Sequence, residues 1–176
     1  MSIGCTPRVY LGLCADARDI IFGSRNKFHP PEVERMTIEA IELRMMEEVT
    51  VRIDGTDVRA GLMGELGTTG DRIFPNEEKG LIAAGRVNCK TNVPIMVHTE
   101  GSEQTVMAAL GILQANGANL EKVNICHVNG AGYWRDVIEA GAYVGLDCFG
   151  STFKITDEQL HILLVENPKH FLDTRR

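Results

Sequence analysis

Short apolar runs separated by longer helix-like stretches restrict the fold of this chain more than any other feature. The runs lie at 60–66, 94–99, 122–127 and 142–147, and a further one lies at 8–13. Strands that alternate with helices form βαβ units, in which the strands lie parallel in one sheet. We therefore expect an α/β fold with about five parallel strands and flanking helices, in a single domain over residues 1–176.

Helix signals fill the stretches between the apolar runs. Pro31 is a natural first helical residue, and Ser102 is a helix cap followed by an apolar periodicity that ends at Gly117. Helices are expected from residue 31 to about 49, from 75 to about 90, from 102 to 117, from about 133 to 140, and from a capping box at 156–159 to Asn167-Pro168. The expected apolar face of the first helix comprises Val33, Met36, Ile41, Met45 and Val49.

Three of the expected strands end in a residue type that binds metals. The run at 60–65 ends in Glu65, the next in His98, and the third in His127. Ligands gather at the carboxyl ends of strands in parallel α/β folds. Two imidazoles and one carboxylate suit a catalytic divalent ion, so the pattern predicts a metal site for hydrolysis. The alternative is that each histidine donates to a backbone carbonyl and Glu65 is solvated.

Seven segments of this chain resemble the phosphotriesterase family of the amidohydrolase superfamily, in family order over most of residues 29–171. The resemblance implies a (β/α)₈ TIM barrel with two divalent metals, usually zinc, that activate hydroxide against a phosphoester or lactone. The segments are His29-Pro-Pro-Glu-Val, Asp54-Gly-Thr-Asp-Val-Arg-Ala-Gly61, Gly64-Glu-Leu-Gly-Thr68, Val97-His-Thr99, Ile125-Cys-His127, Gly141-Ala-Tyr-Val-Gly-Leu-Asp147 and Glu166-Asn-Pro-Lys-His-Phe171.

The resemblance assigns roles to the three strand-end residues. Glu65 matches the carboxylate that bridges the two metals, in the branch that uses glutamate, and His98 and His127 match the histidines that hold one of them. The family's His-x-His is absent, Asn129 stands where an Asp is common, and the eighth strand with its metal-binding Asp has no counterpart. We therefore expect an incomplete barrel with at most one bound ion, zinc, and we assign no catalytic base.

Two function hypotheses follow from these departures. One is a phosphotriesterase-like hydrolase of a small-molecule ester or lactone, weakly active or completed by another chain. The alternative is a non-catalytic truncated or deleted isoform or fragment. Open sheet edges would favour self-association. Strand residues that a closed barrel covers would then lack part of their packing: Leu62, Ile95, Val97, Ile125 and Leu146.

Charge and composition exclude several other classes. The net charge of -6 argues against a nucleic-acid partner, and no apolar stretch is long enough for a membrane helix. Five cysteines without a C-x-x-C pair are typical of reduced thiols, so we expect a cytoplasmic protein.

The other residues with possible chemistry are expected to be structural. Cys126 and His127 could suggest a Cys-His nucleophile, but adjacent strand residues point to opposite faces, so we expect that they do not act together. His29 lies in a loop, His161 and His170 lie on the last helix, and Asp147 is expected to make a cap or loop hydrogen bond.

Overall fold

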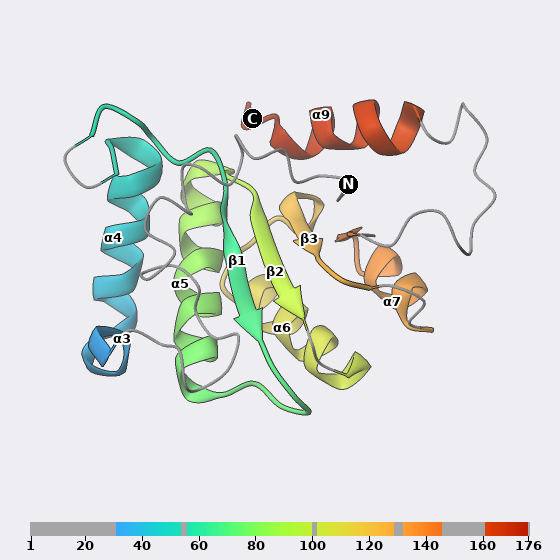
Figure 1. Ribbon diagram of the computed structural model, residues 1–176, viewed down its shortest axis with the longest axis horizontal. Coiled ribbons are helices and arrows are strands. Elements are labelled where there is room, and N and C mark those ends of the chain that lie inside the picture. Colours follow the sequence, from blue (N-terminus) through green and yellow to red (C-terminus); the bar gives the residue numbers. More distant parts are fainter. Residues whose placement is uncertain (1–30, 54–55, 100–101, 129–131, 146–160, 176) are drawn as a thin grey trace.

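The chain forms a parallel sheet of four strands in the order β1-β2-β3-β4 in a computed structural model that describes residues 31–53, 56–99, 102–128, 132–145 and 161–175 (Figure 1). The parallel α/β arrangement predicted from the alternating runs is confirmed. The run at 8–13 lies outside the described residues. The strands are β1 Met63–Thr68, β2 Ile95–Thr99, β3 Val123–Ile125 and β4 Tyr143–Val144.

A helix joins each strand to the next. Helix α5, Pro75–Thr91, lies between β1 and β2, α6, Glu103–Ala115, between β2 and β3, and α7, Trp134–Glu139, between β3 and β4. The 3₁₀ turn η1, Leu120–Lys122, leads directly into β3. Helix α5 packs against β1 and α6, and α4, Ile38–Thr50, packs on the outside of α5 (Figure 1).

The first predicted helix is divided in two. Helix α3 spans Pro31–Arg35, and α4 begins at Ile38. Between them Thr37 has an extended backbone, and its Oγ1 accepts a hydrogen bond from the Ala40 N–H at 3.2 Å. Such a side-chain cap starts a new helix. The predicted apolar face is buried nonetheless, with Met36 partly so.

The last helix does not end at Asn167-Pro168 as predicted. A π-helical turn, η2, spans Ile162–Glu166, and α9 continues as Asn167–Leu172. A proline is tolerated in the first turn of a helix, where its missing N–H would have no intrahelical partner. The prediction was wrong because Pro168 occupies such a first turn. The capping box at 156–159 lies outside the described residues.

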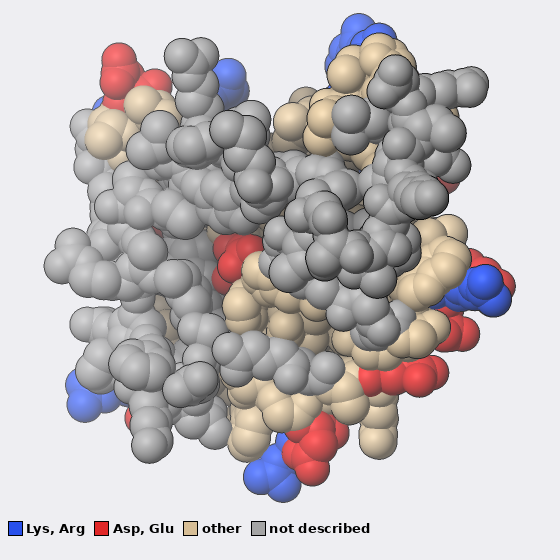
Figure 2. Space-filling model, turned by 45° about the vertical axis from the view of Figure 1, so that its right-hand side comes forward, with Lys and Arg blue, Asp and Glu red and all other residues tan. Residues whose placement is uncertain are grey.

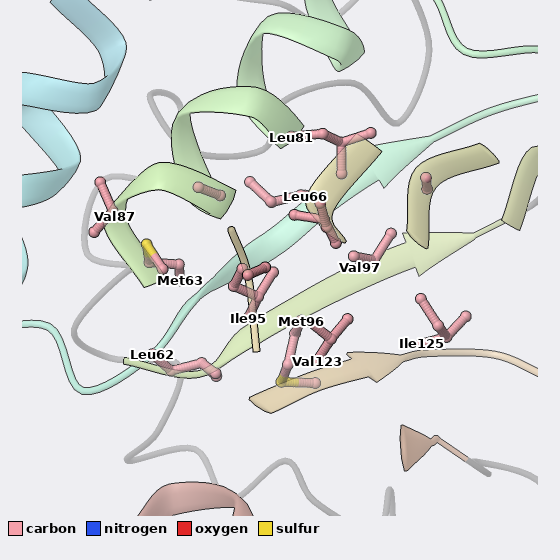
Figure 3. Packing of buried hydrophobic residues seen from close by; sticks show 14 of the residues in the cluster. Leu62, Met63, Leu66, Leu81, Val87, Ile95, Met96, Val97, Val123 and Ile125 are labelled. Carbon is pink, nitrogen blue, oxygen red and sulfur yellow. The ribbon is translucent and has the colours of Figure 1, made fainter. Parts of the chain in front are cut away.

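The strand residues expected to lack packing are buried. Leu62, Ile95, Val97 and Ile125 are each at most 1% exposed, so that expectation was wrong, while Leu146 lies outside the described residues. They belong to the same apolar cluster as Leu81 of α5, which lies over β1 (Figure 3). Helix α5 therefore covers the face of β1 and β2 that carries Ile95 and Val97. Self-association stays a prediction.

The C-terminal helix α9 is fastened near the edge where the strands begin. Lys122, directly before β3, donates from Nζ to the backbone oxygens of His170 and, at 3.3 Å, Phe171. The Tyr143 hydroxyl at the start of β4 lies 2.7 Å from His170 Nδ1. The strand arrows of β1 and β2 in Figure 1 point away from α9. His170 therefore makes its contacts at the edge of the sheet where the strands begin, opposite the edge where they end.

The loop after β1 is held by a buried carboxylate. Glu77, which is 1% exposed, accepts hydrogen bonds from the Thr69 hydroxyl at Oε1 and from the Phe74 N–H at Oε2, both at 2.8 Å. The Gly70 carbonyl in this loop accepts the Thr105 hydroxyl of α6 at 3.1 Å. The loops that follow β1 and β2 are therefore tied together at the carboxyl ends of the strands.

We expect Leu81→Ala to lower the free energy of unfolding by about 2–5 kcal/mol, because it leaves a cavity in the cluster against β1. The matched control Leu43→Ala, at a residue 71% exposed, should change it by less than about 0.5 kcal/mol. Urea denaturation measures both. Equal effects would contradict the assignment of the core to the α5 side of the sheet.

Glu77 gives the stability a predictable pH dependence. Burial raises the pKa of Glu77 above its ordinary 4.5, and the bonds from Phe74 and Thr69 offset this only in part. The folded state then binds the proton more tightly than the unfolded state. The carboxyl's contribution to stability is full below pH 4.5 and declines as the pH rises through the folded-state pKa.

We therefore expect the stability of the native protein relative to Glu77→Gln to decrease from about pH 4 to about pH 7, because glutamine does not ionise. Urea denaturation of both proteins across this range, with chelator present, measures the difference. A difference that increases with pH would show that the ionised carboxylate is the better-accommodated form.

Candidate metal centre

Glu65, His98 and His127 converge beside the carboxyl ends of β1, β2 and β3. One nitrogen or oxygen atom from each residue belongs to a group whose members all lie within 4.8 Å of one another. The parallel register produces this proximity, because β1 pairs with β2 through Gly67 and His98 and β2 pairs with β3 through Val97 and Ile125. The predicted convergence is observed, and the role of these residues as metal ligands stays a prediction.

The distances are close to those of a tetrahedral site. His98 Nδ1 lies 3.2 Å from Glu65 Oε2, and His127 Nε2 lies 3.7 Å from Glu65 Oε1. The two imidazole rings have their centroids 4.5 Å apart and cross at 70°. Tetrahedral bonds of 2.0–2.2 Å separate neighbouring ligand atoms by about 3.3–3.6 Å. Small side-chain movements would therefore suffice to admit a zinc ion.

The three side chains are partly open to solvent. Glu65 is 23%, His98 20% and His127 34% exposed. Closed structural zinc sites use four protein ligands, whereas catalytic sites keep a position for water or substrate. Three candidate ligands with this exposure correspond to the open kind of site.

Strand β1 is shaped around Gly64 immediately before the carboxylate. The pairing with β2 shifts between Met63 and Leu66, and Gly64 has φ +143°. A Cβ atom at Gly64 would lie 2.4 Å from the Met96 carbonyl oxygen, so only glycine fits. The strand also runs on to Thr68, which pairs with Thr99, rather than ending at residue 66 as predicted. Glu65 thus lies within the strand and not at its end.

His127 adopts a left-handed backbone, with φ +63°. Strand β3 ends at Ile125, and the Cys126 N–H still donates to the Val97 carbonyl at 2.8 Å. The backbone then turns at His127, which interrupts the strand alternation. Both neighbours consequently reach Glu65: the imidazole at 3.7 Å, and the Cys126 thiol as a hydrogen-bond donor. The expectation that they face opposite sides was wrong for this reason.

The surroundings keep Glu65 ionised. Burial on its own raises the pKa of Glu65, but the hydrogen bond and charge of His98, the charge of His127 and the Cys126 thiol together lower it below 4.5. A carboxylate that is ionised at neutral pH is the form that binds a metal.

The other candidate residues do not join this group. His161 pairs with Glu166 at 3.3 Å, and His170 bonds Tyr143. No other set of three or more potential metal ligands occurs within the described residues. His29, Asn129 and Asp147 lie outside them. The approach of both Cys126 and His127 to Glu65 was missed, because nothing in the sequence signals the left-handed backbone of His127.

A cavity of about 420 Å³ lies at the opposite edge, lined in part by Lys122, His170, Asp173 and Arg175. None of the three candidate ligands lines it. Three of its charged groups have partners, since Lys122 donates to α9 carbonyls and Arg175 pairs with Asp173 at 2.7 Å. The cavity and the group of candidate ligands therefore lie at different edges of the sheet.

Charged residues of the described part of the chain are visible at the rim of the face shown in Figure 2. Lys and Arg lie there interspersed with Asp and Glu and form no continuous basic patch. No helix among the described residues has both the length and the apolar character needed to cross a bilayer. The absence of a nucleic-acid partner and the cytoplasmic location stay predictions.

The chain is similar in sequence to several known proteins. The chain is 33% identical over 138 residues to the phosphotriesterase homology protein of Escherichia coli, covering 77% of this chain and 47% of that protein. It is 28% identical over 127 residues to an N-acetyltaurine hydrolase of Danio rerio, covering 70% of this chain and 36% of the relative. The chain thus spans less than half the length of either relative.

Solved structures agree with the sequence relatives. The crystal structure of the Escherichia coli protein, with phosphate in its active site, superposes with a TM-score of 0.64 at 30% identity, covering 86% of this chain and 56% of that one. A lactonase from Listeria monocytogenes gives 0.57 at 28% identity, covering 64% and 34%. The four-stranded sheet corresponds to an incomplete TIM barrel of this type. The sequence profile of the Phosphotriesterase family matches residues 25–154, and the chain belongs to that family.

Proposed function

We propose that this chain acts as a metal-dependent hydrolase of a small-molecule ester or lactone, with one zinc ion held by Glu65, His98 and His127. The observation that carries the proposal is the convergence of the three donor atoms within 4.8 Å of one another. The names of two relatives, a lactonase and an N-acetyltaurine hydrolase, support hydrolysis of a small molecule.

The residues present fit a divalent ion in chemistry and in geometry. Glu65, His98 and His127 would hold the ion, and its chemistry would be to lower the pKa of a water towards about 7 and so provide a nucleophile at neutral pH. The protein's part is to present one ionised carboxylate and two neutral imidazoles, and to leave one side open through the partial exposure of all three. No further described His, Cys, Asp or Glu joins the group, so we expect about one ion per chain.

The substrates to test follow from the relatives. Lactones, the phosphotriester paraoxon and N-acetyltaurine all present a polarised carbonyl or phosphoryl group to attack by hydroxide. Turnover that is lost with chelator and restored by zinc would support the hydrolase. Zinc binding without turnover of any of these substrates would favour the non-catalytic alternative.

We expect purified, chelator-treated protein to take up about one zinc ion, and His98→Ala to abolish this binding. The loss should exceed the 10–100-fold that removal of an outer-shell partner costs. Affinity should decrease as the pH falls through the histidine range near about 6.5, because protonated imidazole does not ligate. Titration against a chromophoric chelator measures both effects.

The matched control is His161→Ala, which removes a histidine 60% exposed and paired with Glu166, away from the site. It should leave zinc affinity unchanged. Two tightly bound ions per chain, or equal losses in the two alanine variants, would refute this ligand set.

Because His127 has a left-handed backbone, we expect glycine to give a more stable protein than alanine at this position, the reverse of the usual order in a helix. A residue with a Cβ atom pays roughly 1–2 kcal/mol for this conformation and glycine does not. In chelator, His127→Gly should therefore be more stable than His127→Ala by about 1 kcal/mol. Neither variant should bind zinc.

At His161, which has a helical backbone, we expect the difference in stability between the glycine and alanine variants to have the opposite sign. There, with φ -61° and ψ -46°, glycine should be less stable than alanine by about 1 kcal/mol. Urea denaturation of the four variants measures both differences. The same sign at both positions would show that the His127 backbone is not under conformational strain.

A further inference from the structure

Cys126 is a buried thiol beside the candidate metal ligand Glu65. It is 4% exposed, and its backbone N–H donates to the Val97 carbonyl at 2.8 Å, which holds it beside β2 next to His98. A hydrogen bond from its side chain is one of the interactions that lower the pKa of Glu65, so the thiol lies at that carboxylate. The sulfur is not among the donor atoms that lie within 4.8 Å of one another. It therefore touches a ligand without being one of the converging set.

A second polar side chain supports the thiol. Asn124 lies two residues before Cys126, so both side chains are on the same face of β3. The Asn124 Nδ2 donates to Cys126 Sγ at 3.5 Å. A thiol can accept one hydrogen bond and donate another. Asn124, Cys126 and Glu65 therefore form a hydrogen-bonded row that ends at the carboxylate.

The packing around this row leaves little room for movement. A Cβ atom at Gly145 would lie 3.1 Å from the Cys126 Cα and 3.2 Å from Asn124 Nδ2. Gly145 itself is fixed, because its N–H donates to the Ile125 carbonyl at 2.7 Å. The backbone that follows β4 thus closes over Asn124 and Cys126 and keeps the thiol beside Glu65.

We propose that Cys126, oriented by Asn124, is a positioning residue that fixes the Glu65 carboxylate for metal binding. This inference rests on the proposed function. Glu65 presents Oε2 to His98 and Oε1 to His127, so the orientation of its carboxylate plane determines whether the three donors can meet one ion. A hydrogen bond from outside the ligand set fixes such a plane, and outer-shell partners of this kind govern metal affinity.

The test compares Cys126→Ala with Cys126→Ser in zinc affinity, measured with a chromophoric chelator. We expect the alanine variant to bind zinc about 10–100-fold more weakly, because the carboxylate loses its donor. The serine variant should stay within a few-fold of the native protein, since its hydroxyl donates to the same carboxylate. A thiol that served only to fill space would give the reverse order, because a buried hydroxyl fits an apolar site worse than a methyl group.

Two further single variants and one double variant test whether the loss of affinity is specific to Cys126 and whether Asn124 acts through it. Cys89→Ala removes an exposed thiol away from the ligands and should leave zinc affinity unchanged. Asn124→Ala should weaken binding less than Cys126→Ala, and the double variant should bind no more weakly than Cys126→Ala, because Asn124 acts through the thiol. If the losses of zinc affinity in the two single variants add up in the double variant, Asn124 does not act through Cys126 and the proposed order of the row is wrong.

Cobalt distinguishes positioning from direct ligation. We expect the Co²⁺-loaded protein and its Cys126→Ala variant to show the same near-ultraviolet spectrum, without a thiolate-to-cobalt charge-transfer band that depends on this residue. A band lost only in Cys126→Ala would show that Cys126 is a ligand and overturn its positioning role. Equal zinc losses in the alanine and serine variants, with native binding intact, would overturn the positioning role alone. A native protein that binds no zinc would overturn the proposed function as well.

Discussion

The parallel pairing of β1 with β2 and of β2 with β3 is the constraint on which the candidate site depends. It sets Gly67 beside His98 and Val97 beside Ile125, so that residues far apart in sequence reach the same region of space. Helices α5 and α6 hold this register by covering the other face of the sheet, where Ile95 and Val97 are almost fully buried. The site thus relies on an apolar cluster that packs on the opposite face of the sheet.

Local signals predicted the elements that depend only on nearby residues. Ser102 caps α6 through the Thr105 N–H, and Pro75 opens α5, because capping and proline geometry are properties of a few adjacent residues. The end of β1 was misplaced because its last residue, Thr68, pairs with Thr99 thirty-one residues later. The approach of both Cys126 and His127 to Glu65 was missed because it requires a left-handed backbone at His127, for which the sequence carries no glycine signal.

The backbone departs from regular strand geometry at two places close to Glu65, one on β1 and one after β3. Gly64 brings β1 close to the Met96 carbonyl, and His127 turns the chain after β3. Residues in sparsely populated backbone regions persist where surrounding structure determines them, and they gather at functional sites. Here both departures serve the same three side chains, since one precedes the carboxylate and the other is a candidate ligand itself. Irregular backbone and metal-binding chemistry therefore coincide at one place in an otherwise regular α/β fold.

The described histidines divide between the two edges of the sheet, and the strand direction explains the division. His98 near the end of β2 and His127 just after β3 meet an ionised carboxylate, whereas His170 faces the start of β4 and bonds Tyr143. In barrels of this class the carboxyl edge carries the chemistry and the opposite edge supports stability. Lys122 illustrates the second role, because it joins α9 to the segment before β3 instead of facing a ligand. Residue type alone does not distinguish these roles. The direction of the strand that carries or precedes each residue distinguishes them. Residues at the carboxyl ends of the strands form the candidate metal centre, and residues at the opposite edge hold α9 in place.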